Sequence, residues 1–248
     1  MTTNPLSFPF IKLNEVDSTN NYAMNLVRQG MARNFECIWA LAQNQGKGQR
    51  GNTWLSESGK NLTCSLVYFP LSLEAINNFY LSMTVCIAAK RFLEKICKCV
   101  QIKWPNDLYI NGKKSGGILI ENTLEKQNLK CSVIGLGINL NQSEFHEDIP
   151  NATSVFLNTG KLQDIEESLH LLYDLLTEGL KKLDLKLFPE IKSEYLENLY
   201  GLGHSLKFKD INGEFIAVIE GVENTGELVL RDKAGSQRKY SFKEVELI

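Results

Sequence analysis

The sequence predicts an α+β protein in which a large domain of strands and helices is followed by a small all-β domain. Two observations predict the large domain: a hydrophobic hairpin near the middle of the chain, and long stretches with apolar residues at helical spacing. The small domain follows from a change after residues 201–203 to short alternating strands separated by turn signals. A length of 248 residues suits this division. We therefore expect domains at residues 1–200 and 204–248.

The hairpin spans residues 103–121 and reads KWPNDLYINGKKSGGILIE. Pro105 ends the incoming strand, because it has no backbone N–H to donate. A strand over residues 108–110 then reaches Asn111-Gly112, a dipeptide that favours a tight hairpin turn. In the return strand, Gly116-Gly117 packs no side chain, so it either marks a bulge or lets a ligand approach closely. Charged groups beside these glycines favour a functional hairpin over one that only fills the core.

Before the hairpin, helical and strand-like segments alternate. Ser18 or Thr19 is a natural N-cap for a first helix, which Gly30 is placed to end. The same helix start is equally suited to binding a polar ligand or an anion, and both interpretations remain open. Residues 36–43 and 62–69 are strand-like, and an amphipathic helix is expected over about residues 73–97. The expected buried side of that helix comprises Ile76, Phe79, Tyr80, Met83, Ile87 and Phe92.

After the hairpin we expect a strand over about residues 129–141, a polar loop, and helices over about residues 164–184 and 189–200. Glycines within this strand carry no side chains to pack, and Asn139 and Asn141 place amides at its end. The first of the two helices repeats leucine on one face, at positions 169, 172, 176 and 180. Turns at residues 212–213, 224–226 and 233–235 then fit a small meander or barrel.

The most unusual segment is QNQGKGQRGNTWLSESGKN, between two of the early strands. It is not a Walker phosphate loop, because no GK[ST] follows, and it lacks the helical pattern that follows a Rossmann fingerprint. A flexible cationic loop beside Trp54 can still fold over an anionic ligand, with backbone N–H groups and Arg50 as donors. A disordered surface loop is the alternative.

Composition and charge narrow the class of protein. With 43% hydrophobic and 23% charged residues, the chain resembles an ordinary globular protein. A formal net charge of −2 gives no electrostatic case for binding nucleic acid or a membrane surface. The first ten residues favour neither a signal peptide nor a membrane span. Six scattered cysteines without metal-ligand spacing indicate a reduced, cytoplasmic protein, and the three histidines are expected on surfaces or helix faces.

Four blocks, in this order, resemble those of biotin protein ligases of the kind that lacks an N-terminal DNA-binding domain. They are STN at residues 18–20, GKGQRGNTW at 46–54, the hairpin at 103–121, and GLGIN at 135–139. The resemblance covers most of the chain, from about Glu15 onward. It implies the biotin–lipoate ligase fold, similar to class II aminoacyl-tRNA synthetases, with a mixed sheet and helices followed by a small Src-homology-3-like β-barrel.

The resemblance also implies a reaction. ATP would adenylate biotin to biotinyl-5'-AMP, and biotin would then pass to a specific lysine of a biotin carboxyl carrier protein domain of a biotin-dependent carboxylase. ATP and Mg²⁺ would be required, nucleic acid and membrane would not take part, and the chain would act as a monomer or weak homodimer.

Site residues follow from the resemblance position by position. Lys114 and Arg50 would be the catalytic cations, and Asp107 a possible Mg²⁺ ligand. The implied biotin site comprises Ser18, Thr19, Asn20, Gln43, Gly46, Lys47, Gly48, Gln49, Trp54 and Gly117. The implied nucleotide site comprises Arg50, Trp54, Asn106, Lys114 and Asn139. The general base for the transfer step has no evident candidate.

The glycine loop departs from the commoner family pattern, GRGRRG. Lys47 and Gln49 stand where arginines are usual, which leaves Arg50 as the one guanidinium of the loop. Gln49 removes a permanent charge and a bidentate donor, which lysine does not replace geometrically.

Two other functions are weighed against this interpretation. A lipoate or octanoate ligase of the same fold would need a longer, more apolar slot than STN, Gln43 and Trp54 indicate. A non-enzymatic biotin- or nucleotide-binding regulator would use the C-terminal barrel as an interaction module. The lack of a helix-turn-helix ahead of residue 15, and of basic charge, counts against DNA regulation.

Overall fold

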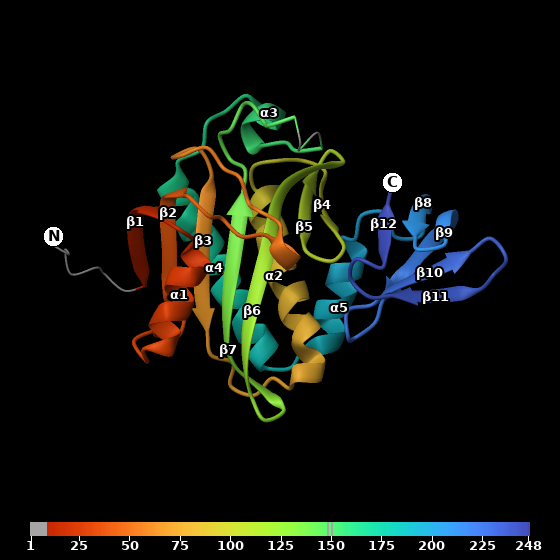
Figure 1. Cartoon of the computed structure of the whole chain (residues 1–248), viewed down its shortest axis with the longest axis horizontal. Coiled ribbons are helices and arrows are strands. Elements are labelled where there is room, and N and C mark those ends of the chain that lie inside the picture. The colour runs from red at the N-terminus through yellow and green to blue at the C-terminus, as the bar shows by residue number, and fades with distance from the viewer. Residues whose placement is uncertain (1–8, 148, 150) are drawn as a thin grey trace, which may run out of the picture.

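A seven-stranded mixed sheet forms the centre of the larger part of the chain (Figure 1). The computed structural model describes residues 9–147, 149 and 151–248, apart from the side chain of Arg50. The strands are β1 (Phe10–Val16), β2 (Cys37–Gln43), β3 (Leu62–Tyr68), β4 (Val100–Lys103), β5 (Asp107–Ile110), β6 (Lys113–Glu125) and β7 (Asn128–Ile138). Their order is β1-β2-β3-β7-β6-β5-β4, with β1 and β2 parallel and every other pairing antiparallel.

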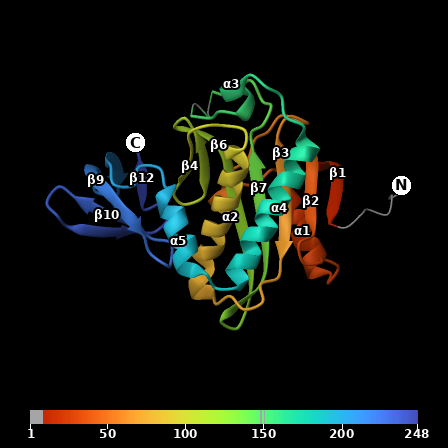
Figure 2. The ribbon, with the colours of Figure 1, turned by 180° about the vertical axis from the view of Figure 1, so that it is seen from behind.

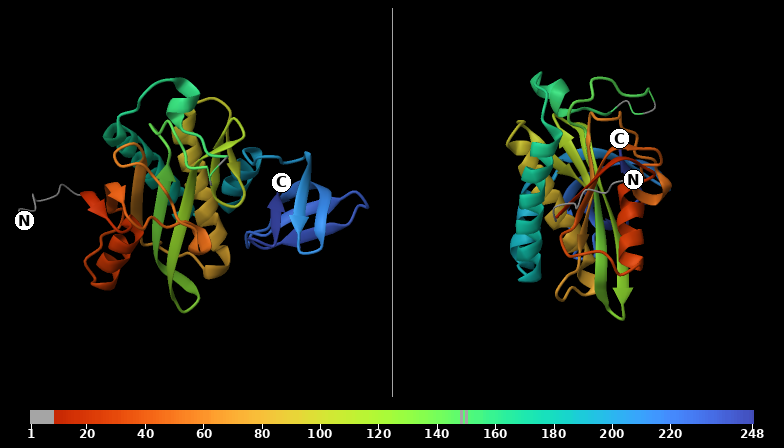
Figure 3. Two further views of the ribbon diagram at one scale, coloured as in Figure 1. Left: turned by 45° about the horizontal axis from the view of Figure 1, so that its top comes forward. Right: turned by 90° about the vertical axis from the view of Figure 1, so that its left-hand side faces the viewer.

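Helices cover both faces of this sheet. The rear face carries α2 (Asn78–Glu94), α4 (Ile165–Asp184) and α5 (Phe188–Glu197), as Figure 2 shows. The front face carries α1 (Thr19–Arg28), which connects β1 to β2 as a parallel pair requires. In the right-hand view of Figure 3, α4 and α1 lie on opposite sides of the sheet. The predicted leucine face of α4 is buried at Leu169, Leu172, Leu176 and Leu180.

The helix expected over residues 73–97 begins later than its periodicity indicates. Residues 75–77 form a 3-10 turn, η2 (Ala75–Asn77), and Ile76 is 64% exposed, so its predicted burial is wrong. The reason is the end of the β6–β7 hairpin, which holds the segment extended. The Leu129 N–H donates to the carbonyl of Leu73, and Ala75 N–H donates to that of Gln127, both at 2.8 Å.

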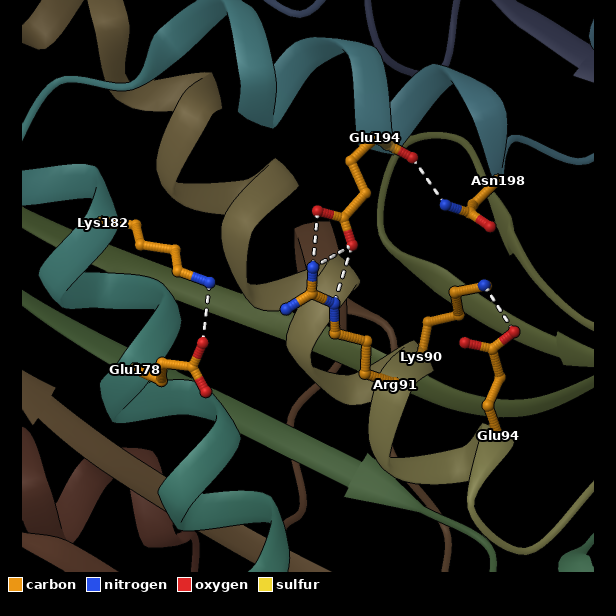
Figure 4. Close-up of polar contacts among 7 residues, drawn as sticks. All are labelled: Lys90, Arg91, Glu94, Glu178, Lys182, Glu194 and Asn198. Atoms are coloured by element: carbon orange, nitrogen blue, oxygen red, sulfur yellow. Dashed lines mark hydrogen bonds and ion pairs between the residues drawn. The ribbon is translucent and has the colours of Figure 1, made fainter.

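One ion pair joins two of the rear helices, and two others lie within single helices (Figure 4). The guanidinium of Arg91 on α2 is bidentate to the carboxylate of Glu194 on α5, at 2.7 and 2.8 Å. The pairs Lys90–Glu94 and Lys182–Glu178 lie within single helices. The Arg91–Glu194 pair thus connects α2 to α5, the helix from which the chain leaves for its C-terminal part.

A five-stranded antiparallel sheet forms the C-terminal part, beyond the β4 edge of the larger sheet (Figure 1). Its strands are β8 (Ser205–Asp210), β9 (Gly213–Val222), β10 (Leu228–Asp232), β11 (Gln237–Tyr240) and β12 (Val245–Leu247), in the order β11-β10-β9-β8-β12. This arrangement fits the expected barrel. The Trp104 indole N–H donates to the Gly226 carbonyl at 2.8 Å, which joins the C-terminal sheet to the end of β4.

Two segments that lack a clear sequence signal also take part in the fold. The edge strand β1 is one, and a five-residue helix, α3 (Val155–Thr159), is the other. The expected polar loop after residue 141 therefore contains a helix, which the Ser154 hydroxyl caps by accepting the Leu157 N–H at 3.1 Å. All six cysteines are free thiols. Within the described residues, none of the helices has the length and apolar character needed to span a membrane.

Candidate active site

Most of the predicted site residues converge on one cavity of about 690 Å³ on the front of the sheet. Those in its wall are Ser18, Thr19, Asn20, Gln43, Lys47, Gly48, Gln49, Trp54, Asn106, Asp107, Lys114, Gly117 and Asn139. Gly46 lines a smaller neighbouring cavity of about 200 Å³. Arg50 belongs to the 3-10 turn η1 (Gln49–Gly51), and its side chain lies outside the described part of the structure.

Glycines in the sheet make room for the side chains that lie over it. Ser65, Gly135 and Leu119 lie side by side on β3, β7 and β6. Asn20, from the first turn of α1, rests on this row, and a Cβ at Gly135 would lie only 2.3 Å from its Oδ1. A side chain at position 135 would therefore displace Asn20.

The next row of the sheet carries Trp54. Here Thr63, Gly137 and Gly117 are neighbours, and a Cβ at Gly137 would lie 2.3 Å from Cε2 of the indole. The indole Nε1 is buried without a hydrogen-bond partner. Gly117 thus opens toward the cavity. Its neighbour Gly116 serves packing, because a Cβ there would meet the backbone of Gly137 at 2.9 Å.

The glycine loop folds back on itself across this front face. The Trp54 N–H donates to the Gly46 carbonyl at 2.8 Å, and the Gly48 N–H donates to that of Asn52 at 2.7 Å. The Lys47 ammonium reaches the amide oxygen of Asn21 on α1 at 2.5 Å. The loop therefore forms one wall of the cavity, which favours a part in the site over the alternative of a disordered surface loop.

The start of α1 forms the polar end of the cavity. Ser18 occupies the N-cap position, but its side chain makes no capping hydrogen bond. The backbone N–H and the hydroxyl of Thr19 both approach Gln43 Oε1, at 2.8 and 3.1 Å. The geometry therefore favours the ligand interpretation of Ser18-Thr19 over capping alone.

The hairpin supplies the charged part of the wall. The Lys114 Nζ lies 2.6 Å from the Asp107 Oδ1, and the two side chains are 35% and 22% exposed. The backbone of Lys114 is fixed as well, since it exchanges hydrogen bonds with the Asn151 carbonyl and the Thr153 N–H, both at 2.8 Å. Lys113 is exposed and lies outside the cavity wall, as strand alternation predicts.

Two asparagines hold fixed amide orientations in the wall. The Asn106 amide donates to the Ile118 carbonyl, and the Ile118 N–H returns a bond to the Asn106 carbonyl at 3.1 Å. The Asn139 Nδ2 donates to the Thr153 carbonyl at 3.0 Å, which leaves Oδ1 as a buried acceptor without a partner. A ligand donor would satisfy it, because buried polar groups are nearly always hydrogen-bonded.

Part of the wall was not predicted from the sequence. The loop after β7 contributes Phe145, Ile149 and Ala152, and the C-terminal sheet region contributes Phe242, Lys243 and Glu246. These residues carry no motif, so only the fold reveals them. Trp104 also lines the cavity, and its place within KWPND was the available signal.

Comparison with known proteins identifies the class to which this site belongs. The model of the biotin/lipoate A/B protein ligase family matches residues 13–139. The chain therefore belongs to the biotin/lipoate A/B protein ligase family.

Individual relatives narrow the similarity within that class. The chain is 32% identical over 234 residues to the biotin–[acetyl-CoA-carboxylase] ligase of Paracoccus denitrificans, covering 91% of this chain and 95% of that protein. It is 29% identical to the bifunctional ligase/repressor BirA of Bacillus spizizenii, covering 94% of this chain and 72% of that protein. The biotin protein ligase of Aquifex aeolicus, solved in complex with biotin and ATP, superposes with a TM-score of 0.79 at 30% identity, covering 97% and 99% of the two chains.

Proposed function

We propose that this chain is an ATP-dependent biotin protein ligase, which adenylates biotin and then transfers it to a lysine of a biotin carboxyl carrier protein domain. One observation carries the proposal: a single cavity joins the polar end at Thr19 and Gln43 to the Lys114 ammonium and the free acceptor of Asn139. Both substrates of an adenylation reaction must lie in one cavity, because the reacting atoms have to approach within about 3.5 Å.

Lys114 serves the adenylation step. A biotin carboxylate oxygen attacks the α-phosphate of ATP, the bond to the bridging oxygen breaks, and pyrophosphate leaves. Two anions meet in this step, so the barrier is largely electrostatic. An ammonium already fixed by Asp107 and by the backbone of its strand opposes the repulsion without reorganising. In the transfer step the lysine amine attacks the biotinyl carbonyl, and AMP leaves.

Asn139 serves nucleotide recognition. Its Nδ2 is committed to the Thr153 carbonyl, so only the acceptor oxygen is available to a ligand. The exocyclic amine of adenine donates a hydrogen bond, whereas guanine carries an acceptor oxygen at the same ring position. The asparagine therefore supports ATP over GTP as the nucleotide.

Asp107 is the proposed ligand of Mg²⁺. Mg²⁺ bound with a nucleotide commonly uses one or two protein carboxylates together with phosphate oxygens and waters. Asp107, in the cavity wall beside Lys114, meets this need, although no cluster of three or more metal-ligating side chains occurs among the described residues. When bound, the ion neutralises charge on the departing pyrophosphate.

The same proposal includes the domain boundaries of the chain and the protein that accepts biotin. Residues 1–200 form the catalytic domain and residues 204–248 a small C-terminal domain. The acceptor is the carrier domain of a biotin-dependent carboxylase, and the ligase works as a monomer or weak homodimer.

Pyrophosphate release from ATP tests the function and its main alternative together. We expect release that depends on biotin and not on lipoate or octanoate, with ATP and not GTP as the nucleotide. Release with lipoate or octanoate alone would favour the other branch of the family. Biotin binding without any pyrophosphate release would favour a non-enzymatic regulator. Mass spectrometry of an added carrier domain then detects the transfer step as addition of one biotinyl group.

A further inference from the structure

We propose that Glu121 and Ser65 are positioning residues that orient the hydrogen bonds at the polar end of the cavity, so that this end accepts an N–H from the ligand. The inference rests on the proposed function, since the ligand is the ureido ring of biotin. Neither residue belongs to the site expected from the sequence, and neither lines the cavity.

A continuous chain of polar atoms runs from Glu121 to the cavity. Its contacts are Glu121 Oε2 to Asn20 Nδ2 at 2.9 Å, Asn20 Oδ1 to Ser65 Oγ at 2.6 Å, Ser65 Oγ to Thr19 Oγ1 at 2.7 Å, and Thr19 Oγ1 to Gln43 Oε1 at 3.1 Å. The three middle residues, Asn20, Ser65 and Thr19, are at most 4% exposed. Because these groups are buried, other protein groups and not solvent determine which of them donates and which accepts in this series of hydrogen bonds.

Both ends of the chain are acceptors. An ionised carboxylate only accepts hydrogen bonds, so Asn20 must turn its NH₂ to Glu121. The Leu119 carbonyl, 3.4 Å from the same nitrogen, favours the same orientation. Asn20 Oδ1 consequently faces Ser65 and accepts. At the other end the backbone N–H of Thr19 donates to Gln43 at 2.8 Å, so Gln43 must present its oxygen.

This series of hydrogen-bonded groups has one proton fewer than it has oxygen–oxygen contacts. Three oxygen–oxygen contacts separate Asn20 from Gln43, but the two hydroxyls, of Ser65 and Thr19, supply only two protons. We assign the two protons to the two shorter contacts. Ser65 donates to Asn20, and because its one proton is then used, the contact between Ser65 and Thr19 takes its proton from Thr19. The long contact of 3.1 Å, between Thr19 Oγ1 and Gln43 Oε1, is then left as a pair of acceptors at the cavity wall. A ligand N–H satisfies this pair, and the ureido ring of biotin carries two.

Changing Glu121 to glutamine reverses the direction in which the hydrogen bonds of this series are donated. A carboxamide can donate, so Asn20 can turn over, against only the long 3.4 Å contact with the Leu119 carbonyl, and donate its NH₂ to Ser65. Ser65 then donates to Thr19, Thr19 donates to Gln43, and every contact holds a proton without the ligand. Ser65→Ala reaches the same end state by another route, because the Thr19 hydroxyl loses its acceptor and donates to Gln43 instead.

The test compares biotin with its cyclic-carbonate isostere, in which ring oxygens replace both N–H groups. Calorimetry should show roughly tenfold weaker biotin binding for Glu121→Gln and for Ser65→Ala, the scale of one hydrogen bond, with isostere binding unchanged. Glu125→Gln is the matched control, because it makes the same change on the same strand at a 65% exposed side chain paired with Lys130. It should bind both ligands as the parent does.

The outcomes separate this inference from the function on which it rests. Equal losses for biotin and isostere in both variants would overturn the orienting role and leave a structural one. Unchanged biotin binding in both would overturn it as well. A parent protein that binds no biotin would instead refute the proposed function. A thermal melt of each variant checks that it is folded at the temperature of the binding measurement.

Discussion

Replacing Lys114 with alanine tests the electrostatic account most directly. Its ammonium lies 2.6 Å from the Asp107 carboxylate, in a partly exposed wall of the cavity. In such surroundings a unit charge about 4 Å from a developing charge interacts with it by about 4 kcal/mol. Only the part gained on reaching the transition state accelerates the reaction. We therefore expect adenylation to slow roughly a hundredfold, the scale of losing one preorganised contact.

Single-turnover formation of biotinyl-5'-AMP from labelled ATP measures this loss. Lys113→Ala is the matched control, because the neighbouring side chain is exposed and outside the cavity, and it should react like the parent. Lys114→Ala also leaves the Asp107 carboxylate without its partner, beside two anionic substrates. A more damaging Lys113→Ala, or parental rates in both single variants, would show that the catalytic cation is misplaced.

Two further substitutions and one titration probe the glycine loop, the sheet glycine beneath Trp54 and the thiols. Gln49→Arg should slow the escape of labelled adenylate by adding a charge-assisted contact, and unchanged or faster escape would contradict this. Gly137→Ala should weaken biotin binding by roughly tenfold and shift tryptophan fluorescence, because a Cβ at this position would lie 2.3 Å from the Trp54 indole and must displace it. A parental dissociation constant for biotin would contradict the role of Gly137 in making room for Trp54. Cys99 is the one exposed cysteine of six, and burial raises the pKa of Cys131 to about 11, so Ellman's reagent should titrate one thiol in the native protein. Rapid reaction of a second would contradict the described burial.

The hairpin was predictable because its signals are local. Asn111 and Gly112 both adopt positive φ, 51° and 76°, as a tight turn between twisted strands requires, and that chemistry can be read from the dipeptide alone. The same holds for α4, whose N-cap Asp164 accepts the Glu167 N–H at 2.9 Å and whose leucines repeat at helical spacing. Motif residues reach one cavity because their blocks lie on adjacent strands or over them.

The unpredicted features depend on pairings between distant residues. Asn20 and Glu121 are 101 positions apart, and no local pattern reveals that one orients the other. Gly116 and Gly117 have different roles that the sequence alone does not separate. Only the strand pairing determines that one faces the core and the other faces the cavity. Ile76 fits the helical period of α2 and is nevertheless exposed, because tertiary pairing with the β6–β7 hairpin overrides helix propensity.

The change in composition after residue 200 marks where the folding pattern changes, but it does not mark where the cavity ends. Phe242 and Lys243 line the same cavity as Lys114, and they lie beyond that point in the chain. Trp104 links the two parts. Its indole donates to the Gly226 carbonyl, and three residues further along the same chain Asp107 pairs with Lys114. The C-terminal sheet therefore contacts the segment that carries the charged wall and lines the same cavity, so it belongs structurally to the site.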